Sequence, residues 1–299
     1  MMGNPLLLSM PGNEDMTSLL AKALGWEIGV LTARRFPDGE SYIRYQTPVV
    51  GREVALVCTL VHPDEKLIAL YLAAKTAREI GATRIGLVSP YLAYMRQDAV
   101  FNDGEGITSH HVATLIGSAV DWLVTVDPHL HRIRALDEIY PINTGVAHAA
   151  PAIFRWIGAN LDKPLVIGPD AESEQWAEEV ASAVGCPFTV LEKTRHGDRD
   201  VEVSVPDIGR WHGHTPVLVD DIASTARTMM AAVAHLKTTA LPPAVCAVVH
   251  PIFAGDAFAA LSACGVAKIV GCNTIEHACA GIDISEALAL AMQSVTRGR

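Results

Sequence analysis

The chain has 299 residues, 50% of them hydrophobic, and a formal net charge of −10 at pH 7. This length suggests about two domains, and the acidic balance argues against nucleic acid as the main partner. An anionic small substrate is not excluded, because a few Arg and Lys residues can set the electrostatic field of a cleft.

From the sequence we expect neither a membrane-spanning helix nor a signal peptide. No apolar run reaches the roughly 18 residues that a membrane-spanning helix needs, and Met1–Pro5 carries no basic residue ahead of the first apolar run. The six cysteines form no C-x-x-C pair, and most lie in apolar runs. We therefore expect a cytoplasmic protein with no membrane partner, whose cysteines are small core residues in a reducing compartment.

Short apolar runs typical of buried strands alternate with amphipathic stretches typical of helices. In chain order, the expected strands are Val54–Cys58, Ile85–Ser89, Leu123–Val126, Leu165–Ile167, Val217–Val219, Val245–Val249 and Ile269–Cys272. The expected helices are Glu65–Ile80, Thr108–Ala119, Ser173–Val184, Thr225–Lys237 and Asp256–Cys264. This alternation predicts an α/β fold with mostly parallel sheets and a domain boundary within Tyr140–Pro151. Similar strand ends at Ser89 and Gly168, each followed by proline, hint at an internal repeat.

Two segments of the first half combine polar side chains with a turn or a strand end. The turn Arg35–Tyr42 places an aromatic residue beside two carboxylates, although it is equally explained as a polar turn with a buried Phe36. After the strand that ends at Ser89, Arg96 offers a bidentate phosphate donor where ligands of open α/β sheets bind. The alternative is that Arg96 pairs with Asp98 on the surface.

Asp127–His129 follows the next strand, and an Asp with a His two residues later suits a metal or a phosphate. His131 extends this to a His-x-His pattern, which raises a zinc site, but cysteine partners at zinc spacing are missing. Asp170 ends a strand of the second half, where it would cap the following helix. Paired with His129, it would instead complete a magnesium site that keeps several waters.

Leu191–Val201 is a basic, glycine-containing segment without apolar periodicity, so we expect a mobile loop. Such a charged loop is usually solvated surface. With Lys193, Arg195 and Arg199, it would also be able to close over an anion and neutralise developing charge.

The most informative segment is Val217–Met230. Its apolar strand runs into two adjacent carboxylates, Asp220 and Asp221, and a loop of small and hydroxyl residues then leads into a helical pattern. The N–H groups and partial positive charge of a helix N-terminus suit a phosphate, and the carboxylates would hold ribose hydroxyls or a metal beside it. The alternative is an acidic strand end followed by a helix that Ser224 or Thr225 caps.

Taken together, these segments resemble the motifs of the ribose-phosphate pyrophosphokinases, the enzymes that make phosphoribosyl diphosphate (PRPP), in the same order and over nearly the whole chain. The matching segments are Phe36–Glu40, Pro90–Asp98, Asp127–His129, Gly168–Ala171, Lys193–Arg195 and Val219–Thr228. The resemblance implies two phosphoribosyltransferase-type α/β domains, 1–145 and 146–299, each a mostly parallel sheet flanked by helices. It also implies an active site between them near a subunit interface, in a homodimer or a higher homo-oligomer.

The resemblance implies a role for each site residue as well. ATP would be held by Phe36, Asp38, Glu40, Arg96, Gln97 and Asp98. Ribose 5-phosphate would be held by Asp220, Asp221, Ser224, Thr225, Ala226, Arg227 and Thr228. Magnesium, the expected cofactor, would be coordinated by His129 and Asp170. The migrating diphosphoryl group would be stabilised by Lys193 and Arg195.

The activity that this resemblance implies is transfer of the β,γ-diphosphoryl group of Mg-ATP to the 1-hydroxyl of ribose 5-phosphate. Two alternatives remain: a non-catalytic relative that binds PRPP or a nucleotide and regulates a partner, and a phosphoribosyltransferase that consumes PRPP. The chain departs from the family motif at Glu172 and at Arg227, where glycine usually lets the backbone follow the phosphate. Phe101–Glu105 resembles the archaeal-like type, so we expect no inhibition by ADP at a separate allosteric site.

Overall fold

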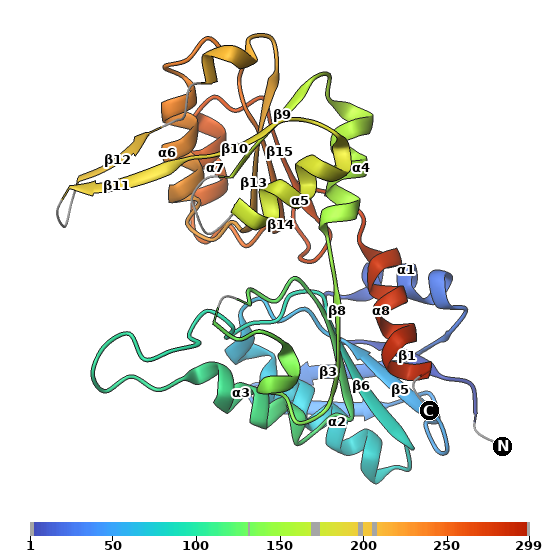
Figure 1. The fold of residues 1–299 in the computed structure, drawn as a ribbon. Helices are drawn as coiled ribbons and strands as arrows, with labels where there is room; N and C mark the ends of the chain where they lie inside the picture. The colour runs from blue at the N-terminus through green and yellow to red at the C-terminus, as the bar shows by residue number, and fades with distance from the viewer. Residues whose placement is uncertain (1–2, 131, 169–173, 197–199, 205–207, 298–299) are drawn as a thin grey trace. The chain divides into compact units, whose positions relative to one another are not determined.

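Two α/β units make up the chain in the computed structural model, which describes residues 3–130, 132–168, 174–196, 200–204 and 208–297 (Figure 1). One unit consists of Met1–His148 together with Ser285–Arg299, and the other of Ala149–Ile284. Within the described ranges, no helix combines the length and the apolar character needed to cross a bilayer.

Six parallel strands form the sheet of the first unit, in the order β2-β1-β5-β6-β7-β8. They are β1 (Leu6–Ser9), β2 (Glu27–Gly29), β5 (Glu53–Val57), β6 (Arg84–Ser89), β7 (Trp122–Val126) and β8 (Asn143–Ala147), and a separate antiparallel hairpin is formed by β3 (Leu31–Arg35) and β4 (Ser41–Tyr45). The helices are α1 (Glu14–Leu24), α2 (Leu67–Glu79), α3 (Thr108–Gly117) and α8 (Ser285–Arg297), and the 3₁₀ turns are η1 (Pro63–Glu65) and η2 (Leu136–Glu138). The interior strand β7 is buried at every position, which explains why all its residues except Thr125 are apolar.

The second unit has a six-stranded parallel sheet in the order β10-β9-β13-β14-β15-β16. Its strands are β9 (Pro164–Gly168), β10 (Phe188–Val190), β13 (Thr215–Ile222), β14 (Val245–His250), β15 (Lys268–Cys272) and β16 (Ala280–Ile282), and its hairpin consists of β11 (Glu192–His196) and β12 (Asp200–Ser204). The helices are α4 (Ala150–Asn160), α5 (Glu174–Val184), α6 (Arg227–Leu236) and α7 (Ala257–Ala263), with a 3₁₀ turn η4 (Ile208–Trp211). Together the two units confirm the predicted α/β fold with parallel sheets.

The two units repeat one order of elements. In each, a strand and a helix lead to the edge strand, a hairpin follows, and the remaining strands are added on the other side of the first strand. By this order, β6 corresponds to β14 and β9 corresponds to β1. The strand ends at Ser89 and Gly168, which hinted at a repeat in the sequence, are therefore not equivalent positions, although the repeat itself is present.

The last helix of each repeat packs in the other unit. α4 follows β8 in the chain but packs against α5, and α8 follows β16 but packs against α1, β7 and β8. The expected division at 145/146 placed residues 285–299 in the second domain, whereas α8 belongs to the first unit. Chain order alone assigns a terminal helix to the domain that it follows, because an amphipathic pattern does not say which sheet covers its apolar face.

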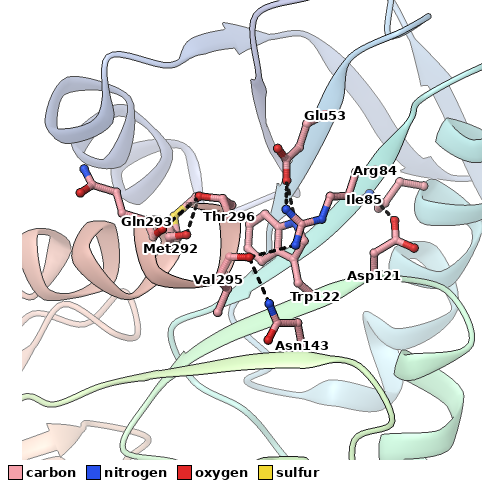
Figure 2. Close-up of polar contacts among 10 residues, drawn as sticks. All are labelled: Glu53, Arg84, Ile85, Asp121, Trp122, Asn143, Met292, Gln293, Val295 and Thr296. Carbon is pink, nitrogen blue, oxygen red and sulfur yellow. Dashed lines mark hydrogen bonds and ion pairs between the residues drawn. The ribbon is translucent and has the colours of Figure 1, made fainter. Parts of the chain in front are cut away.

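The C-terminal turn of α8 is fixed to the first unit by side-chain donors (Figure 2). Arg84 Nη2 and Asn143 Nδ2 both donate to the carbonyl oxygen of Val295, at 2.9 and 3.1 Å. Carbonyl groups in the last turn of a helix have no partner within it, and these donors supply one. Gly145 of β8 makes the close approach possible, since a Cβ at this position would lie 2.9 Å from Cγ1 of Val295.

The strands and helices predicted in chain order each correspond to an element at nearly the same residues. Four of the six cysteines, Cys58, Cys246, Cys272 and Cys279, are buried as expected, whereas Cys186 and Cys264 are half-buried. Burial raises the pKa of the Cys58 and Cys246 thiols to about 12, so both are unreactive core residues at neutral pH.

Candidate functional site

The carboxyl edge of the second sheet carries the two adjacent carboxylates. β13 lies between β9 and β14 and ends at Ile222. Asp220 and Asp221 are both half-buried, and the N–H of Asp221 donates to Asp220 Oδ1 at 3.0 Å. Ligands of open α/β sheets bind beyond this edge, so the carboxylates lie where a small ligand is expected.

The turn between β13 and α6 is held in place by the loop that follows β14. The N–H of Ala223 donates to the carbonyl of His250 at 3.1 Å. In return, the N–H groups of Phe253 and Ala254 donate to the carbonyls of Ala223 and Ser224, at 2.8 and 3.0 Å. The shape of the turn is therefore set by backbone bonds to a neighbouring loop, as preorganised binding of a ligand requires.

The N-cap residue of α6 is Ala226, which has no side-chain acceptor. Neither Ser224 nor Thr225 occupies the capping position, so the alternative in which one of them caps the helix is wrong. The first N–H groups of a helix have no partner within it, and they point, with the positive end of the helix dipole, toward the preceding turn. A turn of this kind after a strand is the usual setting for a bound phosphate.

The left-handed residue of the turn is Ala226, with φ 54° and ψ 14°. The departure from the family motif suggested that position 227 needs the freedom of glycine. Arg227 is instead the first residue of α6 and does not have a positive φ. The Cβ of Ala226 makes its conformation unfavourable by about 1–2 kcal/mol. The side chain of Arg227 is exposed at the positive end of the helix, where a cation is unfavourable.

Replacing Ala226 with glycine should raise the free energy of unfolding by about 0.5–1 kcal/mol, because glycine adopts the left-handed conformation without a steric penalty. Urea unfolding followed by circular dichroism measures the change. Ala223→Gly is the matched control in the same turn, since Ala223 has no positive φ. It should lower stability by about 0.5–1 kcal/mol or more. Equal losses in the two variants would contradict the backbone assignment.

The segment predicted as a mobile loop is a two-stranded antiparallel hairpin in its described residues (β11 and β12, Figure 1). Lys193 pairs with Val203, and Arg195 with Val201. β12 contacts α6, so the hairpin lies beside the helix that follows the carboxylates. Residues 197–199, which include Arg199, are outside the described part of the chain.

Hairpin β3–β4 of the first unit presents the side chains of its turn. The N–H of Phe36 donates to the carbonyl of Glu40 at 2.8 Å, and the N–H of Glu40 donates to Asp38 Oδ1 at 3.2 Å. Phe36 is 39% exposed, which contradicts the alternative of a buried core residue. Its ring packs edge-on against Tyr42 with centroids 5.7 Å apart, and the Arg34 guanidinium lies 4.8 Å from its centroid. An exposed aromatic face is a stacking surface for a base.

Two loops at the carboxyl edge of the first sheet carry the other side chains expected to hold ATP and magnesium. β6 and β7 are neighbours, so the loops that contain Arg96 and His129 begin side by side. Arg96 is exposed, as a residue that contacts a ligand should be. Gln97 is held by its own loop, where its Oε1 accepts a hydrogen bond from Thr108 Oγ1 at 2.8 Å.

Asp98 lies in a different environment from these neighbours. Its side chain is only 3% exposed and forms an ion pair with Arg132, with 2.9 Å between Nη1 and Oδ1. The proposed surface pair between Arg96 and Asp98 is therefore not what the structure contains. A carboxylate this deeply covered and already paired is poorly placed to contact ATP directly.

The turn after β7 is sharply bent. Asp127 and His129 have positive φ values of 30° and 54°, and the N–H of His129 donates to the carbonyl of Asp127 at 2.9 Å. The Asp127 carboxylate lies 3.0 Å from Nδ1 of His148. Asp170 lies outside the described residues, as does Glu172. Among the residues that the structure describes, no three His, Cys, Asp or Glu side chains are grouped to hold a metal.

The side chains of this turn fit Mg²⁺ only if the ion is also bound to the phosphates of a substrate. Mg²⁺ usually keeps several waters and takes one or two protein ligands together with substrate phosphate oxygens. A closed protein cage of the zinc type would need four ligands, which this turn does not supply. His129 would then be one contact of a phosphate-borne ion.

Several supporting residues were missed by the sequence analysis. His148 directly follows β8 and His250 ends β14, so the strand-end rule applied to Asp127 would have found both. Arg132 and Phe253 carry no local signal, because each acts through a contact with a distant segment.

Two family models match the chain, one for each half. The model for the N-terminal domain of ribose phosphate pyrophosphokinase matches residues 6–119, and the phosphoribosyl transferase domain model matches residues 134–252. The second match includes the carboxylate pair, Asp220 and Asp221.

Similar proteins cover the chain almost from end to end. The ribose-phosphate pyrophosphokinase of Halobacterium salinarum is 33% identical over 96% of this chain and 99% of its own length. That of Saccharolobus solfataricus is 32% identical over 91% and 95%. The crystal structure of phosphoribosylpyrophosphate synthetase from Mycobacterium smegmatis has the same fold, with a TM-score of 0.85, 24% identity, and 99% and 100% of the two chains covered. The chain therefore belongs to the ribose-phosphate pyrophosphokinase family.

Proposed function

We propose that this protein transfers the diphosphoryl group of Mg-ATP to the 1-hydroxyl of ribose 5-phosphate, giving PRPP and AMP. The observation that carries the proposal is the end of β13, where Asp220 and Asp221 lie one short turn ahead of the N-terminus of α6. A phosphate site with carboxylates beside it matches a sugar phosphate, whose two ends are an anion and a set of hydroxyl donors. Family membership over nearly the full chain supports the same activity.

The first unit supplies the groups for ATP in this proposal. The exposed Phe36 ring stacks on the adenine, and Asp38 and Glu40 accept hydrogen bonds from the nucleoside. Arg96, exposed beyond β6, binds the phosphates as a bidentate donor, with Gln97 beside it. His129 contributes to Mg²⁺, which supplies charge neutralisation on the phosphate oxygens when bound. A role for Asp170 in the same site stays a prediction from the sequence.

The second unit supplies the groups for ribose 5-phosphate. Asp220 and Asp221 accept hydrogen bonds from the ribose hydroxyls. The 5-phosphate is held by the turn and the first turn of α6, namely Ser224, Thr225, Ala226, Arg227 and Thr228. No protein nucleophile is required, because the sugar hydroxyl itself attacks the β-phosphorus.

Charge neutralisation is the remaining task. A polyphosphate and a sugar phosphate repel each other, so their approach needs cations. Lys193 and Arg195 both lie in strand β11. In this proposal Lys193 and Arg195 act together on the diphosphoryl group as it moves.

Incubation of the purified protein with ATP, ribose 5-phosphate and Mg²⁺ tests this function, with AMP and PRPP measured by chromatography. AMP formation that depends on ribose 5-phosphate is the expected result. A regulator forms no AMP, and a phosphoribosyltransferase consumes added PRPP only when a base is present. The nucleotide groups of a separate first unit favour the synthetase over the transferase.

A homodimer or a higher homo-oligomer is part of the proposal. Ile28, Val30 and Val50 of the first unit are each about half exposed or more, and a subunit contact over them would remove this apolar surface from water. Sedimentation of the purified protein measures the oligomeric state, and a monomer at micromolar concentration would refute it.

Replacing Arg227 with glutamine should raise the KM for ribose 5-phosphate about tenfold, because a charge-assisted hydrogen bond to the phosphate is lost. The same change should raise the free energy of unfolding by about 0.3–1 kcal/mol, since it removes a cation from a helix N-terminus. Steady-state kinetics and urea unfolding measure the two effects.

Lys237→Gln is the matched control, because Lys237 lies at the opposite end of α6, where a cation is favourable. It should lower stability slightly and leave the KM unchanged. An unaltered KM in the Arg227 variant as well would show that this guanidinium does not reach the phosphate.

A further inference from the structure

The Asp98–Arg132 ion pair joins two loops that carry different parts of the proposed ATP site. Asp98 follows Arg96 and Gln97 in the loop after β6, and Arg132 lies three residues after His129 in the loop after β7. β6 and β7 are neighbours in the sheet, but each strand is followed by its own loop. The ion pair, with 2.9 Å between Arg132 Nη1 and Asp98 Oδ1, therefore fixes one loop relative to the other.

Burial makes this contact more than a surface ion pair. The Asp98 side chain is 3% exposed, whereas that of Arg132 is 57% exposed. A covered carboxylate without a cation would be costly, so Asp98 and Arg132 hold each other in place. Most surface ion pairs contribute little to stability because both partners are solvated. The Asp98 carboxylate is covered, so this reason does not hold for its pair with Arg132.

Arg132 makes a second contact with the same loop. Its guanidinium lies 5.1 Å from the centroid of the Phe101 ring, close enough for a cation–π interaction. The Phe101 segment is itself closed by Glu105, whose Oε2 accepts hydrogen bonds from the N–H groups of Phe101 and Asn102 at 2.8 and 3.0 Å. Arg132 thus touches the loop after β6 at two places, Asp98 and Phe101.

We propose that Asp98 and Arg132 are positioning residues that hold the nucleotide-binding loop and the His129 loop in a fixed relation, and that Asp98 does not bind ATP itself. This inference rests on the proposed function, and it changes the role that the family resemblance implied for Asp98. Its physical basis is that Arg96 and His129 must contact one Mg-ATP molecule at the same time, so an error of about 1 Å between their loops is costly.

The test compares Asp98→Asn, Arg132→Gln and the double variant, with Arg134→Gln as the control for loss of an exposed arginine from the same segment. Each single variant should raise the KM for ATP, and the Mg²⁺ concentration for half-maximal activity, about tenfold. The double variant should be no worse than Arg132→Gln alone, because Arg132→Gln already breaks the ion pair and leaves no contact for Asp98→Asn to remove. The KM for ribose 5-phosphate should stay within about twofold of the wild type, since that site lies in the second unit.

A direct role of Asp98 in ATP binding predicts a different pattern. Arg132→Gln would then behave like Arg134→Gln, while Asp98→Asn would lose ATP affinity, and this result would overturn the inference. Additive effects in the double variant would do the same. Arg132→Lys keeps the charge without the planar fork and should recover part of the KM. Arg132→Lys also keeps the test possible if Arg132→Gln does not fold.

Failure of the proposed function is distinguishable from failure of this inference. If the wild type forms no AMP, the function is wrong, and a double-mutant cycle of unfolding free energies for Asp98 and Arg132 still tests the ion pair. If the wild type is active and the cycle shows no coupling, the positioning role is wrong.

Discussion

Lys193→Ala is expected to lower kcat by a factor of about 10²–10³ while leaving the unfolding transition unchanged, as loss of a preorganised charge-stabilising group does. Lys193 lies in β11, paired in register with Val203. Negative charge accumulates as the diphosphoryl group passes between two anions, and an ammonium group is needed at that moment more than in the ground state. The KM values for both substrates should therefore change much less than kcat, which steady-state kinetics with AMP detection measures.

Thr194→Ala is the matched control for this variant. Thr194 is the next residue of the same strand and pairs with Glu202. A hairpin that was merely disturbed would lose activity in both variants. Unchanged turnover in Lys193→Ala would remove this residue from the mechanism, and a loss confined to KM would make it a binding group.

The central elements of both sheets were predictable because their signals are local. β7 is apolar except for Thr125, and the strand–turn–helix from β13 to α6 is contiguous in the sequence. The hairpin β11–β12 was not found. β11 is polar, and the alternation of Val201 and Val203 in β12 becomes a strand only when β11 supplies its hydrogen bonds.

The candidate site likewise contains parts with a local sequence signal and parts that depend on distant contacts. Asp220, Asp221 and the α6 N-terminus were predicted together, since they lie in one continuous segment of the sequence, Val217–Met230. Asp98 looked equivalent to Arg96 because a carboxylate in a strand-end loop suggests a ligand contact. Its partner Arg132 is 34 residues away, and only the tertiary structure brings them together. Sequence patterns locate functional segments, but they do not distinguish a side chain that binds a ligand from one that holds the segment.

Gly86→Ala should lower the free energy of unfolding by about 3 kcal/mol, the upper part of the usual range for overpacking a core. Gly86 of β6 pairs with Trp122 of β7, and a Cβ at Gly86 would lie 2.0 Å from Cε2 and Cζ2 of the indole. The ring cannot move aside easily. Trp122 is fully buried, and its Nε1 donates to Glu53 Oε1 at 2.9 Å, the same oxygen that accepts from Arg84 at 3.1 Å (Figure 2). Urea unfolding measures the loss.

Gly158→Ala provides the control for the change of residue type. Gly158 lies in α4, where a new Cβ would meet no atom within 4 Å, so this variant should gain about 0.5–1 kcal/mol from helix propensity. The double variant Gly86→Ala with Trp122→Leu should not lose the sum of its single changes, because a smaller side chain at 122 makes room for the methyl group. Additive losses, or a loss below about 1 kcal/mol in Gly86→Ala alone, would mean that the sheet shifts to accommodate the methyl group. The contact with Trp122 would then not be what requires glycine at this position.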